Sequence, residues 1–162
     1  MALPYNPRLN DTWLTPPELL KELMVFDLDP CCPSKMPWVT AKTMLHYPKE
    51  NGLKMPWFGR VWCNPPYSRP FPWCDKFFKE AKQGMMLLPA RSSDSKWGQL
   101  CLNSADSIFY FSGRVHFHFE NGVKSTGGVT PHMLVARSEI DTKILIRLQK
   151  KFTGVLMTKL ER

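Results

Sequence analysis

The sequence contains no apolar run long enough to cross a bilayer. Its first residues, Met1-Ala2-Leu3-Pro4-Tyr5, have neither the basic start nor the apolar stretch of a secretory signal. These two absences predict an intracellular, cytoplasmic protein that has no membrane partner.

Paired metal ligands are also absent. The five cysteines are odd in number and form no CxxC pair, and the four histidines do not complete a set of ligands at short spacing. We therefore expect free thiols and no metal site. The cysteines are Cys31, Cys32, Cys63, Cys74 and Cys101.

Acidic residues are scarce relative to basic ones. The chain has 14 Asp and Glu against 22 Lys and Arg, which gives a net charge of +8 and favours a polyanionic partner. With 162 residues, of which 43% are hydrophobic, the chain is long enough for one domain with a real core. We expect a single domain over residues 1–162.

A rigid turn follows one short apolar segment. Val61-Trp62-Cys63 has the composition of a buried parallel strand, and it stops at Asn64-Pro65-Pro66-Tyr67-Ser68. In an open parallel sheet, ligands bind at the carboxyl ends of the strands. Asn64 and the backbone carbonyls can accept hydrogen bonds from one amino group, and Tyr67 offers a flat face to a base. A Pro-Pro turn also serves simply to stiffen a loop, so the turn alone leaves both interpretations open.

The remaining pattern alternates helices and strands. In a predicted helix over 15–24, Thr15 is the N-cap, Pro16 is the first helical residue and Glu18 completes a capping box. We expect an irregular arm over 1–11, tight turns at 30–33 and 51–52, and a flexible loop over 120–130. Further predicted helices cover 73–84, 95–102 and a basic tail, 139–162. Predicted strands cover 25–29, 43–47, 61–63, 85–89, 108–111, 115–119 and 132–136.

Several of these segments, in this order, resemble the small phage-type DNA N6-adenine methyltransferases. Asn64-Pro65-Pro66-Tyr67 is typical of amino-methyltransferases as a class, and Leu87-Leu88-Pro89-Ala90-Arg91 with Gly113-Arg114 narrows the resemblance to this family. It implies an α/β fold with a Rossmann-like methyltransferase sheet, mostly parallel with an antiparallel last strand, and helices on both faces. It also implies an enzyme that uses S-adenosylmethionine to methylate N6 of a flipped adenine in double-stranded DNA, in the host cytoplasm if a phage encodes it.

The resemblance gives three sets of residues expected roles. The catalytic turn would be Asn64, Pro65, Pro66 and Tyr67. The cofactor-binding residues would be Trp13, Thr15, Pro16, Asp29, Pro30, Asn51, Leu53 and Asn64. The residues in contact with nucleic acid would be Tyr67, Ser68, Arg91 and Arg114. The two arginines are assigned from their expected positions at the rim of the sheet, which equally fit ordinary surface arginines.

Two departures from the family pattern leave part of the site open. No Gly-rich loop follows Asp29, where Pro30-Cys31-Cys32-Pro33 stands instead. The segment 30–63, before Asn64, is too short for two strand-helix units. The acidic residue that binds the ribose of the cofactor in this family is therefore not assigned, and Glu50 is a weak candidate for it. The motif also fits a cytosine N4, an RNA base or a protein glutamine. The alternative from another class is a nucleic-acid-binding protein without cofactor binding or catalysis.

Overall fold

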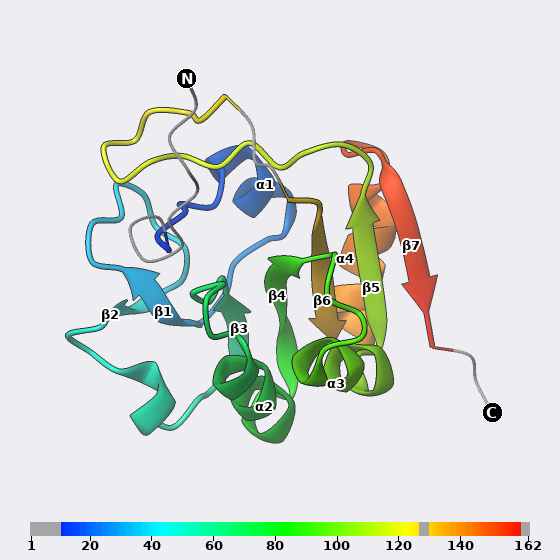
Figure 1. The fold of residues 1–162 in the computed structure, drawn as a ribbon, viewed down its shortest axis with the longest axis horizontal. Coiled ribbons are helices and arrows are strands. Elements are labelled where there is room, and N and C mark those ends of the chain that lie inside the picture. Colours follow the sequence, from blue (N-terminus) through cyan, green and yellow to red (C-terminus); the bar gives the residue numbers. More distant parts are fainter. Residues whose placement is uncertain (1–10, 127–129, 160–162) are drawn as a thin grey trace.

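The computed structural model describes residues 11–126 and 130–159, which form a seven-stranded sheet in the order β2-β1-β3-β4-β6-β5-β7 (Figure 1). β1 (Leu28–Pro33), β2 (Thr43–Tyr47), β3 (Arg60–Cys63) and β4 (Gln83–Pro89) are parallel. β6 (His132–Arg137) runs antiparallel to β4 and to β5 (Ser107–Phe111), and β7 (Gly154–Thr158) pairs antiparallel with β5. The expected mixed α/β class is confirmed, with a parallel half and an antiparallel half. The predicted arm falls almost entirely on residues 1–10, outside the described residues.

Helices cover both faces of the sheet, as expected (Figure 1). α2 (Phe71–Glu80) and α3 (Lys96–Ser104) pack on one face, and α1 (Pro17–Glu22) and α4 (Glu139–Leu148) pack on the other. Successive residues of β4 enter opposite layers, because side chains alternate along a strand. Met86 contributes to the layer under α2 and α3, and Leu87 contributes to the layer under α4. Among the described residues, no helix is long and apolar enough to cross a membrane.

The boundary between α2 and β4 differs from the prediction. The helix was expected over 73–84 with Gly84 as its stop, but α2 ends at Glu80 and Gly84 lies inside β4. Gly84 has a φ of +134°, and a Cβ there would lie 2.1 Å from the backbone oxygen of Val61. The glycine is therefore required because β4 approaches the backbone of β3 closely, and its presence says nothing about a helix end.

Two expectations near the amino end are wrong. Pro16, and not Thr15, occupies the N-cap of α1, without a side-chain capping bond, because the Thr15 hydroxyl bonds Asn64 instead. The strand predicted at 25–29 begins later, at Leu28, and continues through the segment 30–33 that was expected to turn. A break in register between Asp29 and Cys32 lets the strand accommodate Pro30, which has no N–H to donate.

Two expectations in the second half of the chain also fail. The segment 115–119 forms only isolated bridges at His118, to Leu14 and to Lys124, although Val115 and Phe117 are buried as the alternation predicted. The tail over 139–162 is not one helix. It forms α4, which ends at Leu148, followed by the edge strand β7, because Val155, Leu156 and Met157 favour extended backbone beside β5.

A buried ion pair joins the parallel strands to α4. The Nε of Arg60 donates to Oδ1 of Asp141 at 2.7 Å, and Nη2 of Arg60 lies 2.7 Å from the same oxygen. Arg60 Nη1 also donates to the carbonyl of Leu23 at 2.8 Å, while the backbone N–H of Gly84 donates to the other Asp141 oxygen at 2.7 Å. The pair thus ties together the end of α1, the starts of β3 and β4, and α4.

We expect Asp141→Ala to lower the free energy of unfolding by about 3–5 kcal/mol, because it leaves the Arg60 guanidinium buried without its counter-ion. Urea unfolding of the variant and the wild type measures the difference. Lys143→Ala on the same helix is the control, since Lys143 pairs with Glu139 on the exposed face and its loss should have little effect. Equal destabilisation by both variants would contradict the role assigned to the buried pair.

Candidate active site

Two adjoining hollows open at the carboxyl ends of β1, β2 and β3. The smaller is lined by the turn after β3 together with residues of the amino-terminal segment and of β1, among them Trp13, Cys31 and Asn64. The larger has a volume of about 550 Å³, which accommodates a nucleoside-sized ligand. Asp11, Thr12, Tyr47 and Pro66 line both hollows, so the two form one continuous cleft.

Asn64 has a fixed orientation in this cleft. Its side-chain nitrogen donates to the carbonyl of Trp13 at 2.8 Å and lies 3.1 Å from the hydroxyl of Thr15. A backbone carbonyl only accepts hydrogen bonds, so the Trp13 contact identifies the amide nitrogen. With both N–H groups engaged, the Asn64 Oδ1 is the atom left to accept a hydrogen bond from a ligand.

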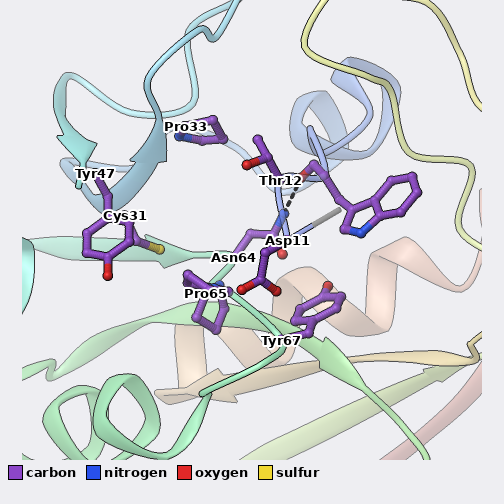
Figure 2. A pocket seen from close by; sticks show the side chains of 10 residues that line it. Asp11, Thr12, Cys31, Pro33, Tyr47, Asn64, Pro65 and Tyr67 are labelled. Atoms are coloured by element: carbon purple, nitrogen blue, oxygen red, sulfur yellow. Dashed lines mark hydrogen bonds between the residues drawn. The ribbon is translucent and has the colours of Figure 1, made fainter. Parts of the chain in front are cut away.

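The rest of the turn is packed in place after β3. Pro65 is buried, Pro66 and Tyr67 are half-buried, and all three line the smaller hollow together with Asn64 (Figure 2). The Tyr67 hydroxyl contacts the carbonyl of Leu87 at 3.4 Å, and its ring centroid lies 5.6 Å from that of His132. Burial raises the pKa of Tyr67, so the phenol is neutral at physiological pH.

Asp11 is a site residue that the sequence reasoning missed. Its two carboxylate oxygens accept hydrogen bonds from the backbone N–H and the hydroxyl of Ser68, the residue that follows Tyr67. Among the described residues that line the two hollows, Asp11 is the sole carboxylate. No local pattern marks it, because its partner lies 57 residues away in the chain.

The predicted residues Asn51 and Leu53 line the larger hollow. The Asn51 side chain accepts a hydrogen bond from the backbone N–H of Leu53 at 3.0 Å and caps the short helix η1 (Gly52–Lys54). Beside them, the rings of Tyr47 and Trp73 meet edge to face with centroids 5.3 Å apart. Neither ring was among the predicted site residues, although both line this hollow, Tyr47 half-buried and Trp73 almost fully buried behind it.

Other predicted cofactor residues lie outside the two hollows. Thr15 is buried and acts through its contact with Asn64, while Pro16 lines a separate hollow beside α1. Pro30 lies in β1, where its backbone oxygen would be 2.0 Å from a Cβ at Gly52. Glu50, the candidate acid, accepts a hydrogen bond from the backbone N–H of His46 and lines neither hollow.

Asp29 is buried in β1 and also lines neither hollow. Its carboxylate accepts hydrogen bonds from the Thr40 hydroxyl at 2.6 Å and from the backbone N–H of Cys31 at 3.2 Å. Burial raises the pKa of Asp29 to about 6, against the opposing effect of these two donors. Its place in the structure is that of a strand-supporting group below the cleft.

The cysteines are free, as predicted. Cys31 and Cys63 lie on neighbouring strands with their sulfur atoms 3.5 Å apart, and burial raises the pKa of both thiols. Cys31 lines the smaller hollow at the place where a Gly-rich loop was absent from the sequence. Within residues 11–126 and 130–159, no group of three or more His, Cys, Asp or Glu side chains could hold a metal ion.

The predicted nucleic-acid residues lie in two places, because Tyr67 and Ser68 line the cleft and the two arginines lie on loops. Ser68 lines the larger hollow, and Arg91 and Arg114 are exposed on the loops that follow β4 and β5. Burial lowers the pKa of His132 to about 4, with smaller contributions from the positive charges of Arg114 and Arg91.

The geometry divides the site into two sides around Asn64. The β1 and β2 side offers a cleft with one carboxylate, hydroxyl groups and aromatic rings. The β4 and β6 side offers the Tyr67 ring and two exposed arginines. Between them, Asn64 presents a neutral hydrogen-bond acceptor, an arrangement suited to holding an amino group between two ligands.

Comparison with known proteins gives one match. A family model described as DNA N-6-adenine-methyltransferase (Dam) matches residues 5–153. No curated protein and no solved structure gives a significant match.

Asp29 makes a testable contribution to the pH dependence of stability. Its pKa is about 6 in the folded protein and ordinarily 3.8, so folding favours the neutral carboxyl. The associated stability is fully present below pH 3.8 and is lost as the pH rises through 6. We therefore expect the free energy of unfolding of Asp29→Asn, relative to that of wild type, to rise by roughly 3 kcal/mol as the pH increases from below 3.8 to above 6.

Urea unfolding of both proteins across this pH range measures that gain. Taking the difference between them cancels the opposite contribution of His132, whose lowered pKa removes stability as the pH falls from 6.5 through about 4. A difference that does not change with pH would show that Asp29 keeps an ordinary pKa in the folded state.

Proposed function

Since the family model covers most of its residues, the chain belongs to the DNA N-6-adenine-methyltransferase family, and we propose that it transfers a methyl group from S-adenosylmethionine to N6 of an adenine flipped out of double-stranded DNA. Membership of the family supports methylation of adenine in DNA. We propose in addition that the methyl donor is S-adenosylmethionine, that the base is flipped and that the enzyme acts at a specific site. The observation that carries them is the orientation of Asn64, whose amide nitrogen is held by Trp13 and Thr15.

The cleft beside β1 and β2 fits S-adenosylmethionine in size and chemistry. When bound, this cofactor supplies an electrophilic methyl group on a sulfonium. Tyr47 and Leu53 offer apolar surface for an adenine ring, with Trp73 supporting Tyr47 from behind, and Asp11 offers an acceptor for hydroxyl or ammonium protons. Cys31 and Pro33 line the smaller hollow, where we propose that part of the cofactor approaches β1 without a glycine-rich loop.

Asn64 and Pro65 would act on the target amino group. The N6 lone pair of adenine is delocalised into the ring, so the nitrogen is a poor nucleophile. Hydrogen bonds from N6–H to the Asn64 Oδ1 and to the Pro65 carbonyl would aim the lone pair at the methyl group and favour the positive charge that develops on N6. Both acceptors are neutral and already fixed, so positioning supplies much of the rate.

Tyr67 would hold the flipped base. An adenine in a duplex hides its N6, and unstacking it costs a few kcal/mol. Stacking on the Tyr67 ring would return roughly 1–3 kcal/mol of that. The ring is suited to this because its hydroxyl contacts the Leu87 carbonyl and its edge packs near His132, so little freedom remains to be lost on binding.

Arg91 and Arg114 are the proposed phosphate contacts. Both are exposed at the rim on the Tyr67 side, and the net charge of +8 favours a polyanion. We propose a short recognition sequence read by the loops after β4 and β5, with residues 1–162 acting as one methyltransferase domain. A cytoplasmic location, where its DNA substrate would be found, is part of the same proposal.

Asn64→Ala should abolish methyl transfer, because it removes Oδ1 and releases the contact with Trp13. The assay measures labelled methyl from S-adenosylmethionine in unmethylated duplex DNA after digestion to nucleosides. Wild type should yield N6-methyl-2′-deoxyadenosine, and the yield of the variant should fall by about 10²-fold or more, as expected for loss of a group that stabilises the transition state. Asn103→Ala, an exposed asparagine on α3, is the matched control and should retain activity.

The same assay separates the alternatives. Label in N4-methyl-2′-deoxycytidine would show that the same methyl transfer acts on cytosine. Label only in an RNA substrate would show that it acts on RNA. No label in any nucleoside, together with DNA binding but no S-adenosylmethionine binding by calorimetry, would support the inactive nucleic-acid-binding protein and overturn the enzyme.

A further inference from the structure

A third hollow lies apart from the catalytic cleft and shares none of its lining residues. It opens beyond the carboxyl end of β5, between α1, the loop after β5 and the segment that joins α4 to β7. Its walls combine basic and aromatic side chains. These are Phe111, Arg114, His116, Lys124, Lys151 and Phe152.

The charge of this hollow is positive and only partly neutralised. Arg114, Lys124 and Lys151 line it together with one carboxylate, Glu18, which lies 3.4 Å from Lys124. Among the described residues, neither Arg114 nor Lys151 forms an ion pair. Two exposed cations that line one hollow favour an anionic ligand, because a negative charge between them offsets their mutual repulsion.

The apolar wall points to a ligand larger than a bare anion. The rings of Phe111 and Phe152 meet edge to face with centroids 6.0 Å apart, and both are half-buried against the layer beneath α4. Each therefore exposes part of a ring to the hollow that the cations surround. A basic opening with aromatic surface behind it matches a nucleotide, which carries a phosphate and a flat base or sugar face.

The fold relates this hollow to the catalytic turn. β5 and β4 are parallel to each other, since β6 is antiparallel to both, so their carboxyl ends share one edge of the sheet (Figure 1). Phe117, three residues after Arg114, packs against His132 with ring centroids 4.8 Å apart, and the ring of His132 lies 5.6 Å from that of Tyr67. A DNA strand whose target base reached Tyr67 would have its neighbouring phosphates on this side.

We propose that the third hollow binds a nucleotide of the substrate DNA next to the target adenine, with its phosphate at Arg114 and Lys151 and its sugar or base against Phe152. The inference rests on the proposed function, since it takes DNA as the substrate. It adds His116, Lys124, Lys151 and Phe152 to the DNA-binding surface and explains why basic residues gather on the segment between α4 and β7.

The test is binding of a fluorescent 20-base-pair DNA duplex of mixed sequence, measured by anisotropy over a range of salt concentrations. Arg114→Gln combined with Lys151→Gln should weaken binding on the order of tenfold near physiological salt. The slope of log affinity against log salt should fall by roughly two, one for each lost phosphate contact. Phe152→Leu, which keeps an apolar side chain, should weaken binding without changing the slope.

Lys79→Gln combined with Lys82→Gln removes the same charge near the opposite edge of the sheet and should leave the slope as in wild type. Arg114→Lys, which keeps its charge, should do so as well. If the salt slope is the same in the Arg114/Lys151 variant and in the Lys79/Lys82 variant, the proposed site is wrong. It is also wrong if an RNA of equal length binds more tightly than the DNA duplex and this binding depends on Arg114. Unchanged affinity in Phe152→Leu would overturn the nucleotide in favour of a phosphate alone. The readout is binding, so it is independent of methyl transfer. If the wild type methylates DNA and the variants show none of these effects, only this inference is wrong. If the variants show the effects and the wild type transfers no methyl group, only the proposed enzymatic activity is wrong.

Discussion

The buried pair of Arg60 and Asp141 is the contact on which the arrangement of the site depends. Arg60 is the first residue of β3, and Asn64 follows the last residue of the same strand. By binding Asp141, which also accepts the N–H of Gly84, the arginine fixes the start of β3 against β4 and α4. Its further bond to the Leu23 carbonyl holds the end of α1. A short strand anchored at one end leaves little freedom for the turn at the other.

The second constraint is the closure of the turn by the amino-terminal segment. Trp13 and Thr15 take both hydrogen atoms of the Asn64 amide, and Asp11 takes the N–H of Ser68. Residues near the start of the chain thus bracket the motif on both sides. The segment was expected to contact a cofactor directly, and its contacts assign much of that role to orienting Asn64. Orientation matters here because an amide rotated by half a turn would present a donor where the proposed chemistry needs an acceptor.

The parts that the sequence predicted are those that local chemistry determines. Two consecutive prolines after an apolar segment have few conformations available, and the apolar run 85–89 could only be a buried strand, so the core of the sheet and the position of Asn64 followed. The missed parts depend on distant contacts. Asp11 is recognisable only through Ser68, β7 only through β5, and Thr15 only through Asn64, which competes successfully for the hydroxyl that would otherwise cap α1.

Glycine shows the same division between local and distant causes. The chain lacks a glycine-rich loop after β1, which suggested that a close approach to the backbone there was lost. In the structure the close approaches are between strands and loops of the protein itself. Gly84 lets β4 lie against Val61, and Gly52 lets η1 lie against Pro30. Pro30 can stay within β1 because the register breaks beside it, so the strand ends only at Pro33, on the wall of the cleft. The glycines of this region are thus required by contacts within the protein, Gly84 by the approach of β4 to β3 and Gly52 by the approach of η1 to β1.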